Sequence, residues 1–121
     1  MAQNQLNRKG YIACSISLTT TAVYLISQIE TALGLPPNSL ARSFREVQIQ
    51  VDPETSSALS VRIGDGSLGT TVGGVVQKGV TIGGGGADTY RSGSSVSVYA
   101  GMMMVQAVSG EPIINVQLLD A

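Results

Sequence analysis

Side chains that perform acid–base chemistry are scarce in this chain, which contains no histidine and one cysteine. Histidine is the commonest general base and the commonest metal ligand, so nucleophilic triads built on histidine are excluded. The thiol of Cys14 has neither a histidine partner nor basic neighbours in sequence that would activate it. Its place in the apolar run YIACSISL instead predicts a small buried hydrophobe, with no intrachain disulfide.

Carboxylates are the remaining candidates for catalysis or metal binding. A carboxylate pair can hydrolyse a glycosidic bond, and carboxylates beside glycines can offer oxygens to calcium. The spacing of an EF-hand is absent around Asp65 and Asp88, and turn chemistry accounts for acids in loops. We therefore expect no catalytic residue and no metal site, with an enzyme using carboxylates alone as an alternative. The acids in predicted loops are Asp52, Glu54, Asp65, Asp88 and Glu111.

Two glycine-rich strings invite comparison with phosphate-binding loops. Gly64 to Gly69 has the form GxGxxG and follows a predicted strand. In a dinucleotide-binding fold the third glycine opens a helix that holds the pyrophosphate, but the continuation Thr70 to Gly74 favours a turn or strand. Gly83 to Gly86 lacks the Gly-Lys-Ser or Gly-Lys-Thr of a P-loop. We expect no cofactor, a strand exit at the first string and a flexible loop at the second.

Two alternating runs flank a polar loop between Arg45 and Gly66. In 46–51 and 59–63 apolar and polar residues alternate with the period of two that is typical of half-buried strands. Pro53 lies between the runs and cannot donate to a central strand. We therefore predict adjacent strands joined by a surface turn, forming a central hairpin. Its polar face, either solvated or covered by a neighbour, comprises Gln48, Gln50, Ser60 and Arg62.

One short helix is expected over about residues 21–34, where apolar residues recur at helical spacing. Thr20 or Thr21 can serve as its N-cap, and Gly34 marks its end. A helix of about three turns is marginal alone in water, so its apolar stripe must lie on an end or face of the sheet.

Many short strands separated by turn signals complete the pattern. Twelve of the fifteen glycines lie between Gly64 and Gly101. The expected fold class is mainly all-β: a single antiparallel β-sandwich or jelly roll. Residues 1–10 form a predicted flexible N-terminal arm and 11–121 the β-sandwich domain. Further strands are expected at 11–20, at 94–99 continuing into 102–105, and at 113–118. We expect the three methionines at 102–104 to fill the core or to form a subunit interface.

The surface is short of charge, since charged residues make up 12% of the chain, against ~25% in typical soluble domains. Either a membrane or neighbouring subunits could cover such a surface. The longest apolar run, 98–105, is too short to span a bilayer, so an assembly-bound protein is favoured over a membrane protein. A solvated surface rich in serine, threonine, glutamine and glycine is the alternative. The net charge of −1 argues against direct nucleic-acid binding, and residues 1–10 contain no secretory signal or lipidation site.

The order of elements, from about Thr19 to Leu119, carries a resemblance to a known class. It begins with the helix LISQIETALG and continues with Arg45, the strand VQIQVD, a polar loop and VRIGDG. A glycine-broken middle, VSVYAGMMMVQA and INVQLL follow. This order resembles the small β-sandwich or jelly-roll virion proteins of tailed phages, including capsid decoration and cement proteins.

The resemblance implies a non-enzymatic structural role in a virion that is assembled in the host cytoplasm. The expected partner is the major capsid protein or another virion protein, and the expected state is a homo-oligomer, with a trimer favoured. A tail, neck or fibre component with a carbohydrate- or receptor-binding role is the alternative; Tyr90 and Tyr99 would then contact the ligand. The residues expected to contact a partner are Gln5, Arg8, Lys9, Arg42 and Arg45.

Overall fold

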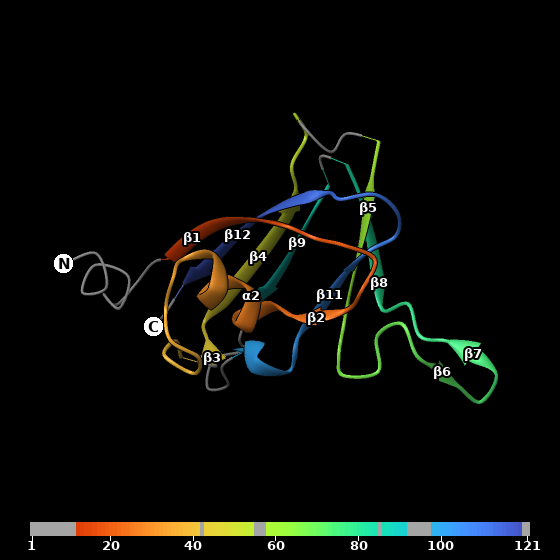
Figure 1. Ribbon diagram of the computed structural model, residues 1–121, viewed down its shortest axis with the longest axis horizontal. Helices are drawn as coiled ribbons and strands as arrows, with labels where there is room; N and C mark the ends of the chain where they lie inside the picture. The colour runs from red at the N-terminus through yellow and green to blue at the C-terminus, as the bar shows by residue number, and fades with distance from the viewer. Residues whose placement is uncertain (1–11, 42, 55–57, 85, 92–97, 120–121) are drawn as a thin grey trace.

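Two four-stranded antiparallel sheets pack face to face (Figure 1). The computed structural model describes residues 12–41, 43–54, 58–84, 86–91 and 98–119. The first sheet contains, in spatial order, β1 Ile12–Ser17, β12 Ile113–Leu119, β4 Glu46–Val51 and β9 Ala87–Arg91. The second contains β2 Val23–Tyr24, β11 Met104–Ala107, β5 Ser60–Gly64 and β8 Val80–Gly83.

The connections between these eight strands follow a jelly-roll order. Counted along the chain, the first, eighth, third and sixth strands form one sheet, and the second, seventh, fourth and fifth form the other. The chain thus passes from one sheet to the other at nearly every connection, as in a double-sheet jelly roll. Only β5 and β8 are consecutive among the eight and also hydrogen-bonded to each other. The predicted all-β fold class is confirmed.

The predicted central hairpin is wrong, because β4 and β5 belong to different sheets. β4 pairs with β12 and β9, whereas β5 pairs with β11 and β8. The alternation itself is confirmed. Val47, Ile49, Val51 and Val61 are fully buried, and Ile63 is only 3% exposed. A period of two tells which face of a strand is buried, but it does not tell which strand lies beside it.

The core lies between the inner faces of the two sheets. On β12, Ile114, Val116 and Leu118 are buried while the residues between them point outward, as the sequence predicts. Each such side chain contributes roughly 1.5–3 kcal/mol through its removal from water. Cys14 is half-buried against the edge of this core, so its predicted burial is only partial.

The helix α2 spans Leu25–Ala32 and is shorter than predicted. Its N-cap is Tyr24, whose side chain makes no capping hydrogen bond, and neither Thr20 nor Thr21 takes that place. The reason is that β2 pairs with β11 and holds the expected first turn in the sheet. Gly34, in the left-handed region at φ 71°, follows the helix end as predicted. No helix in the described part of the chain has the length and apolar character to cross a membrane.

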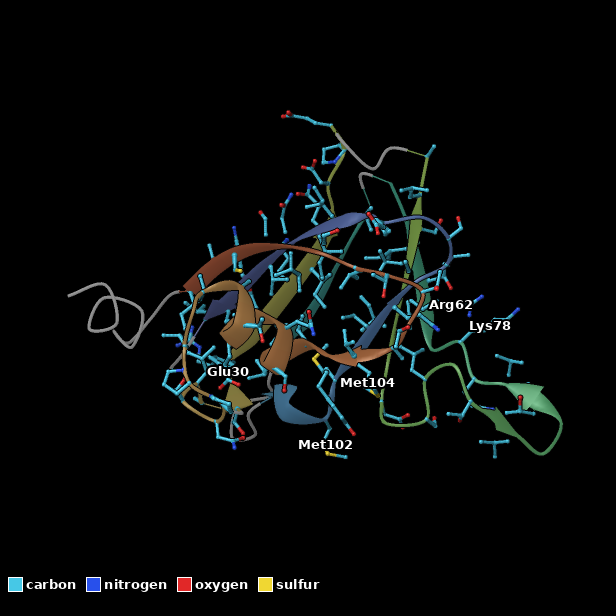
Figure 2. The ribbon with its side chains drawn as sticks, in the orientation of Figure 1. Glu30, Arg62, Lys78, Met102 and Met104 are labelled. Atoms are coloured by element: carbon cyan, nitrogen blue, oxygen red, sulfur yellow. The ribbon has the colours of Figure 1, made fainter. Side chains whose placement is uncertain are left out.

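A buried carboxylate ties the helix to the loop that follows it. Glu30 is 3% exposed, and its two oxygens accept hydrogen bonds from the backbone N–H groups of Asn38 and Leu40, at 3.2 and 2.9 Å. Figure 2 shows Glu30 on the helix, facing this loop. These charge-assisted bonds offset the cost of burying the carboxylate, so we assign Glu30 a structural role.

The predicted strand from 94–99 into 102–105 is broken in the structure. Residues 94–97 lie outside the described part of the chain. β10 Val98–Tyr99 pairs with β3 Ser43–Phe44, and the 3-10 turn η1 Ala100–Met102 then leads to β11. The methionines at 102–104 therefore do not alternate within one strand. Met102 is 54% exposed, whereas Met103 packs against the core.

Candidate functional site

A small hairpin extends from the body of the sandwich between β5 and β8. Its strands are β6 Thr71–Val72 and β7 Val75–Val76, and Figure 1 shows it projecting well beyond the two sheets. Gly73 and Gly74 connect the strands with φ angles of 60° and 83°. Positive φ at both central residues defines a type I′ turn, whose twist suits a two-residue hairpin and which glycine adopts without strain.

Backbone hydrogen bonds extend the ladder of the hairpin down to its base. The Gly69 N–H donates to the Gln77 carbonyl oxygen, and the Gln77 N–H donates to the Thr70 carbonyl oxygen. The N···O distance is 2.8 Å in each bond. The side chain of Leu68 is 3% exposed beneath this ladder. Gly79, at φ 57°, lies so close to the backbone of Ile63 that a Cβ atom there would overlap the Ile63 carbonyl oxygen. The close approach of Gly79 to Ile63 is thus a contact between the base of the hairpin and β5.

The hairpin carries apolar side chains into solvent. Val72 is 55% exposed, Val75 is 62% exposed and Val76 is 44% exposed. Val72 and Val75 are cross-strand partners and share one face of the hairpin. A two-stranded hairpin alone is at best marginally stable in water, and these side chains bury little within their own chain. This arrangement is typical of a surface that another molecule covers.

A pocket of about 430 Å³ opens at the base of the hairpin, where β5 ends and β8 begins. Its volume falls within the ~300–1,000 Å³ typical of ligand sites. The walls are mainly apolar, and Val80 at the rim is 50% exposed. The lining residues are Ile63, Gly64, Asp65, Ser67, Leu68, Gln77, Gly79, Val80 and Met103.

Asp65 places an exposed carboxylate in the lining of this pocket. Its Oδ1 atom accepts hydrogen bonds from the Ser67 hydroxyl at 2.7 Å and from the Ser67 backbone N–H at 2.9 Å. These two bonds, the hydroxyl first, lower the pKa of Asp65 below its ordinary value of 3.8. The pocket therefore has apolar walls and an anionic group, which suits an apolar ligand with a nearby cation.

The Asp65 turn can be tested by titration. In Ser67→Ala the hydroxyl donor is lost, so we expect the pKa of the Asp65 carboxyl to rise toward 3.8 from its lower wild-type value. The measurement is the chemical shift of the Asp65 side-chain carbonyl carbon as a function of pH. Ser39→Ala is the control, because the Ser39 hydroxyl donates to Pro36 in another loop. An equal pKa in Ser67→Ala and wild type would contradict the turn.

The GxGxxG string is confirmed as a strand exit. β5 ends at Gly64, residues 65–69 form turns, and the short strand β6 follows where a dinucleotide-binding loop would begin a helix. In the second glycine-rich string, the N–H of Gly86 donates to the carbonyl oxygen of Gly83, with an N···O distance of 2.8 Å.

Of the five predicted partner-contact residues, the structure describes only Arg45. Gln5, Arg8, Lys9 and Arg42 lie outside the described residues. Arg45 is exposed directly after β3, and Figure 1 places β3 at the opposite end of the molecule from the β6–β7 hairpin. Its backbone N–H donates to the Leu119 carbonyl oxygen over 2.8 Å. Of the two tyrosines expected to contact a ligand, Tyr90 lies in β9 and Tyr99 in β10.

A row of polar side chains crosses the outer face of the first sheet. The Ser15 hydroxyl donates to Asn115 Oδ1 over 2.7 Å. Asn115 Nδ2 in turn donates to Gln50 Oε1 at 3.2 Å and to Asp52 Oδ1 at 3.1 Å. The predicted polar face of the 46–51 run is therefore part of a cross-strand network, which also presents amide and carboxylate groups at the surface.

Within the described residues, no cluster of three or more aspartate, glutamate or cysteine side chains could hold a metal ion.

The β6–β7 hairpin was not predicted from the sequence, although Val-Gly-Gly-Val at 72–75 is a recognised signal for a type I′ turn. Comparison with known proteins found no matching family model, no matching curated protein and no matching solved structure.

Proposed function

We propose that this chain is a non-enzymatic structural subunit that attaches to other subunits of a larger assembly. The assembly we propose is the virion of a tailed phage, in which the chain acts as a decoration or cement protein on the head. The observation that carries the proposal is the projecting β6–β7 hairpin with its exposed valines.

The exposed valines of the β6–β7 hairpin leave apolar surface in contact with water. Exposed apolar surface costs roughly 25 cal/mol per Å² relative to burial, so a partner that covers the face formed by Val72 and Val75 gains binding free energy. The hydrogen bonds among Gly69, Thr70 and Gln77 extend the hairpin ladder, which reduces the conformational entropy that the hairpin loses when it docks. The low share of charged residues in the chain, 12%, also favours subunit contacts over free solvation.

The strand order supports the same class of function. Double-sheet jelly rolls recur in viral capsid proteins, in lectins and in cupins. A fold by itself does not determine function, because many functions share each common fold. The strand order therefore adds weight only together with the hairpin and with the resemblance in element order to phage virion proteins.

Density-gradient centrifugation tests this proposal. We expect the intact chain, detected by antibody, to band with virus particles from lysates of cells that encode it. Dissociating the particles with denaturant should move the chain to the top of the gradient, which controls for aggregates that sediment alone. Recovery of the chain only from particle-free fractions would contradict the proposal.

A tail, neck or fibre component that binds carbohydrate is the second candidate, and the outer polar row favours it. The amide and carboxylate groups around Asn115 are of the kind that bind sugar hydroxyls. A glycan array would then give binding in the micromolar range, lost in Asn115→Ala and retained in Ser39→Ala. Absence of binding to any glycan would remove this candidate.

A further inference from the structure

We propose that the β6–β7 hairpin of one copy of this chain inserts into the pocket at the base of the hairpin of a second copy. This inference deepens the proposed subunit role by naming the partner of one surface, but it does not depend on the location of the assembly. The β6–β7 hairpin is the knob, and the pocket beneath Val80 is the hole.

A hairpin cannot fill its own pocket. Gln77 and Gly79, which lead from the hairpin into β8, are themselves part of the pocket wall. The tip at Gly73 and Gly74 points away from β5 and β8 in Figure 1. From Gly69 to the tip the strand spans about 13 Å at ~3.3 Å per residue, so any contact between a knob and a hole joins two molecules.

The two surfaces match in chemistry. The face formed by Val72 and Val75 is apolar, and the pocket presents Ile63, Leu68 and Met103 as apolar walls. The pocket is large enough for valine side chains, with a volume of about 430 Å³.

The charges at the contact are also complementary. Asp65 places a carboxylate in the pocket lining, and Lys78 lies at the base of the hairpin, where Figure 2 shows it projecting from the body. The charged side chain beside the knob is therefore cationic, and the charged side chain in the hole is anionic. The net charge of −1 gives little long-range repulsion between copies.

Knob and hole are different surfaces, so two copies can either exchange both across a two-fold axis or join head to tail in a heterologous contact. A heterologous contact closes into a ring when the rotation between copies permits it. One intact knob and one intact hole, supplied by two different chains, are then sufficient for a single contact. This property allows a complementation experiment.

Sedimentation equilibrium of the full chain measures the association. We expect wild-type protein to form more than a monomer at micromolar concentration, and we expect Val75→Asp and Val80→Asp each to weaken association at least tenfold. Mixing the two variants should restore a one-to-one dimer, because Val75→Asp keeps the pocket and Val80→Asp keeps the hairpin. Val108→Asp is the matched control, since Val108 is a valine 40% exposed on the β11–β12 connection, and it should associate as wild type does.

Thermal unfolding of each variant verifies that it is folded, and Val80→Asn replaces Val80→Asp if the latter melts early. A monomeric wild-type protein, a Val75→Asp variant that associates normally, or a mixture without dimer would overturn the inference. None of these results bears on particle binding, because a chain that is monomeric in solution can still band with particles. The gradient experiment therefore fails or succeeds independently.

Discussion

Val61→Asp is expected to destabilise the domain severely. Val61 is fully buried in β5, where its backbone neighbours are Ala107 on β11 and Ile82 on β8. The substitution loses roughly 1.5–3 kcal/mol of apolar burial and places a carboxylate in the core at a cost of several kcal/mol more. Total stability is typically ~5–15 kcal/mol, so we expect at least about 4 kcal/mol to be lost. Urea unfolding followed by circular dichroism measures the change.

Arg62→Ser is the matched control on the opposite face of the same strand. Arg62 is half-buried, and its neighbours in the sheet are Gln106 and Thr81. Surface substitutions of this kind usually change stability by about 0.5 kcal/mol or less, so Arg62→Ser should unfold near the wild-type urea concentration. Equal loss of stability in the two variants would show that the strand faces the other way.

Gly79→Ala is expected to have the second largest effect. A methyl group at this position would overlap the Ile63 carbonyl oxygen and lie 3.1 Å from the Gly64 Cα atom. The backbone at the base of the hairpin must move, and the left-handed φ of 57° adds strain of about 1–2 kcal/mol. We expect about 3 kcal/mol or more to be lost in urea unfolding, because the overlap involves backbone atoms that cannot rotate away.

Gly74→Ala controls for the cost of left-handed backbone alone. Gly74 has φ 83°, and a Cβ atom there would meet nothing within 4 Å. Its substitution should therefore cost only the ~1–2 kcal/mol of strain. If Gly79→Ala and Gly74→Ala are equally stable, the close approach of residue 79 to β5 is incorrect.

Local pattern was sufficient for the fold class and for most of the core. Alternation in 46–51, in 59–63 and in 113–118 identifies the buried face of each strand, except that Leu59 lies just before β5 and is only half-buried. Pairing depends on which strand lies alongside, and in a jelly roll the partner is usually distant in sequence. The hairpin predicted around Pro53 was wrong for that reason: β4 and β5 have similar patterns but different partners.

The helix and the methionine segment show how tertiary contacts change local structure. The helical spacing of apolar residues begins at Ala22. Val23, however, pairs with Val105 and is therefore part of the second sheet instead of the helix. Near Met102 a 3-10 turn replaces strand, because the chain leaves the pairing of β10 with β3 and joins the second sheet as β11. The sequence pattern does not signal the change from helix to strand at Val23 or the change from strand to 3-10 turn near Met102.

The candidate site was less accessible to sequence reasoning than the fold. Gly64 to Gly69 was predicted correctly as a strand exit, and the Val-Gly-Gly-Val signal could have located the hairpin tip. Exposure of the valines could not be predicted, since valine in a short strand is usually buried. The pocket joins Ile63 to Met103, residues forty positions apart, and only the fold brings them together.

We propose that this chain is a structural subunit present in a fixed number of copies in a virus particle. The most direct test of this proposal is quantitative mass spectrometry of gradient-purified particles, which gives the number of copies of the chain per copy of the major shell protein. We predict a fixed ratio that is unchanged between preparations and after repeated banding. A ratio that falls toward zero with each round of purification would contradict the claim.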